Sequence, residues 1–214
     1  MTNVLVVYTS TLGNTHKMAE AVADGARSVE ATSVILREAT AATKAEVRAC
    51  DALLLGTPMR HRSADARVKQ FIENTIEVLW LTDELVGKVG GVFSVGGGYG
   101  NAGAGVEITQ LGLLAAMAAA GMIMVPLPKT TPGAGVAGSH WGAHGRSGGP
   151  NMEPVGITDE MLQCAYHHGA NVARVAVALQ GKNLMAQGNQ APSPELIALF
   201  SGSGTTVDEQ QMSL

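Results

Sequence analysis

The chain has 214 residues, of which 14 are Lys or Arg and 18 are Asp or Glu, so its formal net charge is −4. That balance excludes the strongly basic surface that nucleic-acid-binding proteins need. Hydrophobic residues make up 46% of the chain and charged residues 15%, which excludes intrinsic disorder and is enough to build a core.

Strand-like apolar segments alternate with helix-like segments along the chain. We expect strands over residues 3–9, 33–36, 52–56, 89–95 and 122–127. Helical spacing predicts a first helix through Met18, Val22 and Ala26, followed by helices over 64–79, 108–120 and 158–180. Because the strands lack polar alternation, they indicate a parallel sheet covered on both faces. The predicted fold is a doubly wound α/β sheet that binds ligands at the carboxyl ends of its strands.

The two cysteines and the N-terminal residues of the sequence indicate the cellular compartment. Cys50 and Cys164 are far apart and form neither a CxxC pair nor a metal-ligand cluster, which is typical of a reduced chain with two buried thiols. No basic side chain precedes Lys17, which does not fit a signal peptide. Residues 108–128 are uncharged, but Gly121 and the prolines after it divide them, so we expect no membrane span. The expected location is the cytoplasm.

Two segments interrupt the alternation. Residues 128–157 are rich in glycine and proline, and we expect them to need a neighbouring subunit to become ordered. Residues 1–181 are predicted to form one domain, and residues 182–214 a C-terminal extension that is either a flexible tail or an oligomer arm, with one short helix at 194–200. On the last long helix, His167 and His168 are expected at the surface or at a subunit interface.

The segment from Ser10 to Thr15 has the character of a phosphate-binding loop. It lies between the first strand and the first helix, where free backbone N–H groups and the helix dipole favour an anion. Hydroxyl and amide side chains add donors, and Gly13 allows close approach of the backbone. The loop lacks the lysine of a Walker A motif. The alternative is an ordinary helix start with a polar N-cap.

The wider sequence around this loop resembles a known family. Residues 6–22 are similar to the flavodoxin-type FMN phosphate signature, and residues 55–60, 71–75 and 121–126 resemble the WrbA family of NAD(P)H:quinone oxidoreductases. The resemblance covers residues 3–181. It implies a flavodoxin-like, five-stranded parallel sheet, bound FMN, NADH or NADPH as hydride donor, a quinone or similar aromatic acceptor, and a homotetramer.

The resemblance also implies which residues bind. The FMN phosphate would contact Ser10, Thr11, Leu12, Gly13, Asn14 and Thr15. The ring would lie beside Thr57, Pro58, Met59, Arg60, His61 and Arg62, and a third FMN loop would be Ser94, Val95, Gly96, Gly97, Gly98, Tyr99 and Gly100. Trp80 matches a family tryptophan near the substrate site. The chain departs from the family pattern at Leu12, His61, Arg62, Ala119 and Ala120.

Other patterns leave alternatives open. Residues 98–103 read GxGxxG, as in a Rossmann dinucleotide site, but no acidic residue follows at 122–126 to bind the ribose. The positive groups at 60–62 would favour negative charge on the flavin by about a few kcal/mol at an effective dielectric of 20. Alternatively they form a solvated basic loop partly paired with Asp65.

We also predict an acceptor pocket. His140, Trp141 and His144 are expected to form one wall of it, with the histidines supplying a proton to the quinone. The spacing of the histidines also suits a metal, but they lie among glycines rather than on a helix, so we expect none.

Three functional classes fit the sequence. In the first, an FMN enzyme transfers hydride from NAD(P)H to a quinone, and we name no catalytic side chain because the flavin performs the chemistry. The second is a flavodoxin-type single-electron carrier, whose strongly acidic character this chain does not share. The third is a flavin-binding regulatory scaffold.

Overall fold

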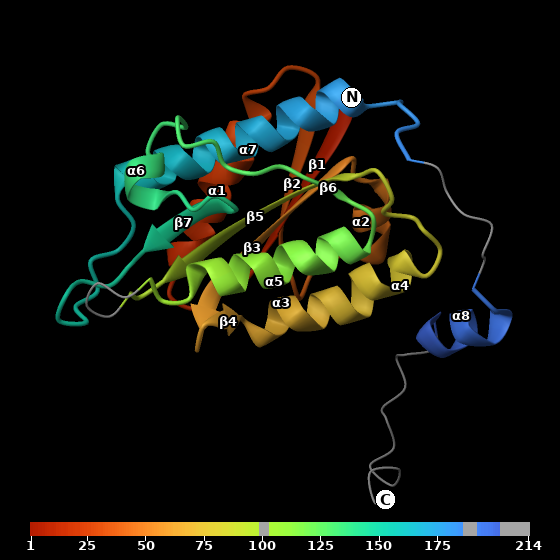
Figure 1. The fold of residues 1–214 in the computed structure, drawn as a ribbon, viewed down its shortest axis with the longest axis horizontal. Coiled ribbons are helices and arrows are strands. Elements are labelled where there is room, and N and C mark those ends of the chain that lie inside the picture. Colours follow the sequence, from red (N-terminus) through yellow and green to blue (C-terminus); the bar gives the residue numbers. More distant parts are fainter. Residues whose placement is uncertain (99–102, 186–191, 202–214) are drawn as a thin grey trace, which may run out of the picture.

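A computed structural model describes residues 1–98, 103–185 and 192–201, in which a parallel sheet lies between two layers of helices (Figure 1). The strands are β1 (Thr2–Tyr8), β2 (Thr32–Glu38), β3 (Ala52–Arg60), β4 (Ser63–Ala64), β5 (Val89–Gly96), β6 (Ile123–Met124) and β7 (Gly142–Arg146). The helices are α1 (Asn14–Arg27), α2 (Lys44–Ala49), α3 (Ala66–Phe71), the π-helical turn η1 (Ile72–Ile76), α4 (Glu77–Trp80), α5 (Val106–Ala119), α6 (Ala134–Ala137), α7 (Asp159–Leu179) and α8 (Pro194–Ser201).

The strand order confirms a flavodoxin-like α/β fold but corrects the predicted strand number. Strands β2, β1, β3, β5 and β6 follow one another in a parallel path, with β4 added to β3 and β7 added to β5, so the sheet has seven strands rather than five. The start of β5 pairs with β6, and its end pairs with β7. The fifth position of the sheet is therefore shared by two short strands.

The segment between β6 and β7 leaves the sheet and returns to it. It carries α6, which packs against α7, and β7 then pairs with Val92–Gly96 of β5. The expectation that residues 128–157 need a neighbouring subunit for order is wrong, because strand pairing and helix packing within the chain hold α6 and β7. Glycine-rich β7 has little strand propensity of its own, so its pairing with β5 determines its conformation.

Two separate cores result from the alternation of side chains along each strand. In β1, Val4 and Val6 face the core beneath α1 and α7, whereas Leu5 and Val7 face the core beneath α2, α3 and α5. Burial on both faces explains why β1 is apolar throughout. Cys50 and Cys164 are buried, unbridged thiols, as predicted.

All five predicted helices are present, and the short helices α2 and α6 are added to them. The helix expected over 64–79 is the run α3–η1–α4, and the short helix expected at 194–200 is α8. Helix α2 was not predicted, although its first turn holds a capping box: the Glu46 amide donates to the Thr43 hydroxyl, and the Thr43 amide donates to the Glu46 carboxylate. No helix in the described ranges is long and apolar enough to cross a membrane.

His168 corrects a second expectation. It is fully buried rather than at the surface or at an interface. Its ring lies over β5 where Gly91 has no side chain, since a Cβ there would be 3.5 Å from His168 Nε2. Desolvation lowers the pKa of His168 to about 4, so the ring is neutral near pH 7.

Helices α1 and α7 cross at glycines. A Cβ on Gly25 would lie 1.8 Å from the Tyr166 carbonyl oxygen, and a Cβ on Gly169 would lie 2.0 Å from the Val22 carbonyl oxygen. The two backbones touch at both points, so a methyl group fits at neither without moving a helix. This contact fixes α1, and with it the loop that precedes α1.

We expect Gly169→Ala to lower the free energy of unfolding by roughly 1–3 kcal/mol, because the added methyl group forces α1 and α7 apart. Gly112→Ala is the matched control on the exposed side of α5, where nothing lies within 4 Å of the new Cβ. It should raise stability by about 0.5–1 kcal/mol through helix propensity. Urea unfolding of both variants measures the difference, and equal stabilities would contradict this description of the helix contact.

Candidate functional site

Strand register brings three loops together at one edge of the sheet. Tyr8, the last residue of β1, pairs with Gly56 of β3, which pairs with Phe93 of β5, and β3 and β5 continue beyond this level to Arg60 and Gly96, so all three carboxyl ends lie at the same edge. The loops that follow enclose a cavity of ≈ 150 Å³. Its lining consists of Ser10, Thr11, Leu12, Asn14, Thr15, Pro58, Met59, Arg60, Val95, Gly96, Gly97 and Ser147. All but Ser147 were predicted cofactor contacts.

The first of these loops leaves the N-terminus of α1 open. Gly13 is the N-cap residue at φ 81°, no side chain caps the helix, and the first turn contains no acidic residue. The alternative of an ordinary capped helix start is therefore wrong. The φ of Gly13 lies in the left-handed region, which favours glycine. The exposed N–H groups and the helix dipole of this 14-residue helix suit an anion.

Two buried hydroxyl groups at this loop make no hydrogen bond within the described part of the chain. Ser10 Oγ and Thr9 Oγ1 are buried and have no hydrogen-bond partner in the described part of the chain. Leaving such groups unpaired costs free energy, so buried hydroxyl groups beside a cavity are usually satisfied by water or by a bound ligand. Because hydroxyl donors and free helix N–H groups are what a phosphate requires, the residues present fit the phosphate of a flavin mononucleotide.

The second loop is the β3–β4 hairpin. Arg60 lines the cavity, whereas His61 and Arg62 form the turn at φ 46° and 65° and are exposed. Arg62 instead borders a second cavity of ≈ 580 Å³. The buried Thr57 hydroxyl accepts from the Asp65 amide at 2.9 Å and donates to the Pro58 carbonyl at 3.0 Å. The Thr57 side chain therefore shapes the hairpin instead of lining the cavity.

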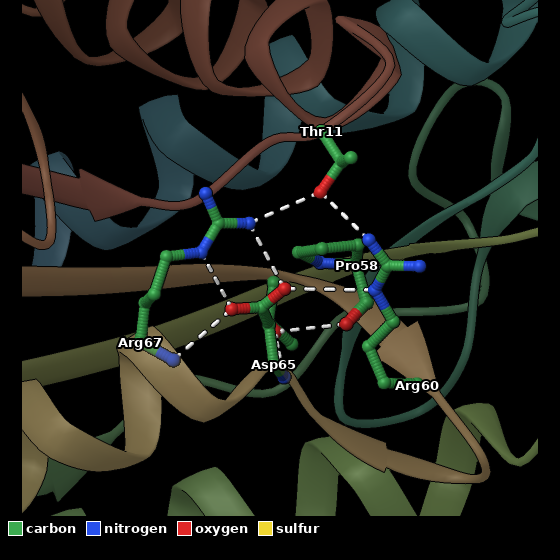
Figure 2. A network of polar contacts seen from close by, with 6 residues as sticks. Thr11, Pro58, Arg60, Asp65 and Arg67 are labelled. Carbon is green, nitrogen blue, oxygen red and sulfur yellow. Dashed lines mark hydrogen bonds and ion pairs between the residues drawn. The ribbon is translucent and has the colours of Figure 1, made fainter.

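An arginine pair joins the first two loops (Figure 2). Arg60 Nη2 donates to Thr11 Oγ1 at 2.7 Å, and Arg67 Nη2 donates to the same oxygen at 3.1 Å. Arg67 also pairs with Asp65 at 2.8 and 3.0 Å, and Arg60 Nε lies 3.6 Å from that carboxylate. Hydrogen bonds from Arg67 lower the pKa of Asp65. The partial pairing of the basic loop with Asp65, one of the two alternatives, is present, and the role of Arg67 was missed.

The third loop contributes backbone rather than side chains. Val95, Gly96 and Gly97 line the cavity, and a Cβ on Gly96 would lie 2.0 Å from Met59 Cε. The Gly98 carbonyl accepts from Arg146 Nη2 at 2.7 Å. The expected contacts at Tyr99 and Gly100 lie outside the described residues.

Behind the third loop, Ser94 is turned away from the cavity. Its hydroxyl is fully buried and accepts from Gln110 Nε2 at 3.0 Å. Gln110 Nε2 also donates to the Ala143 carbonyl at 2.9 Å. The side chain of Ser94 therefore joins α5 and β7 to the sheet, and Ser94 does not line the loop cavity where its flavin contact was expected.

The predicted acceptor wall is not assembled within the chain. His140 borders the ≈ 580 Å³ cavity, Trp141 borders an apolar groove of ≈ 410 Å³ beside α5, and His144 on β7 points to Ser94, with Nδ1 3.4 Å from its hydroxyl. Burial lowers the pKa of His144 to about 4. The three rings face different surroundings because β7 and the turn before it direct successive side chains to different sides.

Trp80 lies far from this wall. It ends α4, ahead of the turn that leads to the amino end of β5, and Figure 1 shows α4 at the opposite end of the molecule from β4, which follows the carboxyl end of β3. Its side chain is 46% exposed. Within one chain, Trp80 does not reach the loops after β1, β3 and β5.

Known sequences similar to this chain include flavodoxins and NAD(P)H dehydrogenases (quinone). Residues 5–98 match the family described as flavodoxin domain. "NAD(P)H dehydrogenase (quinone) 3" of Rhizobium meliloti (strain 1021) is 34% identical over 205 residues, an alignment that covers 84% of this chain and 94% of that protein. A flavodoxin of Aquifex aeolicus (strain VF5) is 40% identical over 114 residues, covering 53% of this chain and 59% of the flavodoxin.

Solved structures of flavodoxin-like proteins are similar to this chain in fold. The flavodoxin, WrbA-like protein from Agrobacterium tumefaciens superposes with a TM-score of 0.65 at 26% identity, covering 83% of this chain and 99% of that one. An archaeal flavodoxin at 20% identity shares the fold, with a TM-score of 0.59 over 82% of this chain and 99% of its own.

The surroundings of His144 predict its titration. Since burial disfavours the imidazolium, its ring-proton NMR signals should shift with a midpoint near pH 4, and His144→Asn assigns them by removing them. The neutral ring's contribution to stability is complete above the unfolded pKa of about 6.5 and is lost as the pH falls towards 4. A midpoint at pH 6 or above would show that His144 is solvated and able to serve as a proton donor.

Proposed function

The chain belongs to the NAD(P)H dehydrogenase (quinone) family, and from that premise we propose that it is an FMN-dependent oxidoreductase that reduces a quinone or similar aromatic compound with NADH or NADPH. In the net reaction, one hydride from the nicotinamide and one proton convert the quinone to a hydroquinone. The observation that carries the cofactor assignment is the buried, unpartnered hydroxyl of Ser10 beside the open N-terminus of α1.

We assign the two ends of FMN to different loops. Ser10, Asn14 and Thr15, with the N–H groups at the start of α1, would hold the phosphate. Pro58, Met59 and the backbone of 95–97 would border the ring. When bound, FMN supplies the ability to accept and pass on a hydride. The protein binds and orients the reactants, and Arg60 lowers the cost of placing negative charge in the cavity.

The cavity favours an enzyme over the single-electron carrier. Its described lining includes Arg60 and no carboxylate, whereas a flavodoxin-type carrier would surround its flavin with acidic residues. The nearest acid in the hairpin, Asp65, is neutralised by two arginines. The described lining of the cavity therefore does not repel a small anionic or quinone-like reactant electrostatically.

We propose that His140 contacts the quinone or aromatic acceptor, because it borders the cavity of ≈ 580 Å³ that Arg62 also lines. Neither His144, which is half-buried and faces Ser94, nor Trp141, which borders a separate groove, lines that cavity within one chain. Trp80 would serve only if another copy of the chain brings it to the site. We therefore propose a homo-oligomer, a tetramer by family resemblance, which the exposed apolar groove along α5 supports.

Steady-state assay of the flavin-loaded protein tests the proposal. NADH or NADPH oxidation should accelerate on addition of a benzoquinone, while Ser10→Glu should lose FMN and turnover because the new carboxylate repels the phosphate. Gln163→Glu, on the exposed side of α7, adds the same charge elsewhere and should leave both unchanged. A flavin-loaded protein that fails to oxidise either nucleotide would favour the electron carrier, and normal FMN affinity in Ser10→Glu would exclude the loop assignment.

Light scattering tests the assembly. We expect a particle of four chains, each of 22.0 kDa. Replacing exposed Leu111 with Glu should charge the groove and shift the mass towards smaller species. A monomer at micromolar concentration would contradict the proposed oligomer.

A further inference from the structure

Thr11 receives two hydrogen bonds on one oxygen. Arg60 Nη2 and Arg67 Nη2 both donate to Thr11 Oγ1, at 2.7 and 3.1 Å (Figure 2). A hydroxyl group has one proton to donate and two lone pairs to accept with. The two arginines therefore occupy its acceptor capacity, and its own proton must be directed elsewhere.

That proton has no acceptor assigned to it in the described part of the chain, and Thr11 lines the loop cavity. Resting on the proposed function, we infer that Arg67 is a positioning residue that holds Thr11 as a hydrogen-bond donor to the FMN phosphate. The site would thereby select a phosphorylated flavin over one that lacks the phosphate.

Arg67 is held firmly enough for this task. Its Nε and Nη2 atoms bind the two oxygens of Asp65 at 2.8 and 3.0 Å, a bidentate geometry that fixes the guanidinium plane. Asp65 is itself fixed: its amide donates to Thr57 Oγ1, and its carboxylate accepts from the Arg67 amide at the start of α3. The Asp65 side chain is only 8% exposed. One end of the phosphate loop is thus tied to β3 and α3 before any ligand arrives.

Arg60 and Arg67 also place positive charge beside the phosphate loop. Arg60 and Arg67 share one carboxylate, which leaves an excess positive charge beside the loop. Of the two arginines, only Arg60 lines the cavity, so a change there would also disturb contacts with the ring. Arg67 touches the cavity only through Thr11, which makes it the informative residue to replace.

The test compares FMN with riboflavin, which has the same ring and no phosphate, by flavin fluorescence on the apoprotein. Arg67→Gln should raise the Kd for FMN by about 10- to 150-fold, the loss expected of one hydrogen bond to a charged group, and leave the Kd for riboflavin within about twofold. Lys69→Gln is the control: Lys69 lies on the same helix and pairs with Glu73 on the surface. It should change neither Kd.

A double-mutant cycle shows whether Arg67 acts through Thr11. Thr11→Val should weaken FMN binding, and the double variant should lose clearly less binding free energy than the sum of the two single variants, because only the charge of Arg67 acts without Thr11. Additive losses, an unchanged FMN affinity in Arg67→Gln, or an equal loss for riboflavin would overturn the inference while leaving the proposed function intact. A wild-type chain that binds no FMN would overturn both.

Discussion

Parallel pairing of β1, β3 and β5 is the constraint from which the rest of the site follows. Because all three strands run in the same direction and their carboxyl ends lie at the same edge of the sheet, the loops after Tyr8, Arg60 and Gly96 meet there. Parallel pairing also requires crossover helices, and the crossover from β1 to β2 places the N-terminus of α1 at that edge. The glycine contacts between α1 and α7 then hold this helix against the sheet.

Within this frame, the cavity combines two ways of binding an anion. The loop at 10–15 offers neutral donors and the dipole of α1, which act at short range and in fixed directions. Arg60 and Arg67 add positive charge but are restrained by Asp65, so they do not collapse into the cavity. In the proposed complex, the neutral donors would hold the phosphate and the arginines would add a net positive charge beside the same loop.

The sequence predicts those parts of the molecule that depend on local pattern. The apolar run of β1 and the polar loop after it are both recognisable, and the structure places them as expected. Parts that depend on distant neighbours were missed or misplaced. Strand β7 is glycine-rich and exists only through pairing with β5, and His168 is buried because Gly91, 77 positions earlier, leaves it space. The hydrogen bond from Arg67 to Thr11 was not predicted, because the two residues lie 56 positions apart in the sequence.

Identification of the bound flavin tests the central claim most directly. The purified protein is denatured, and the released cofactor is identified by mass and quantified against the chain. The arrangement of Ser10, Thr11 and Thr15 at the start of α1 predicts FMN at one molecule per chain. Release of FAD or riboflavin, or a chain that takes up no FMN when it is supplied, would contradict a cavity built around a single terminal phosphate.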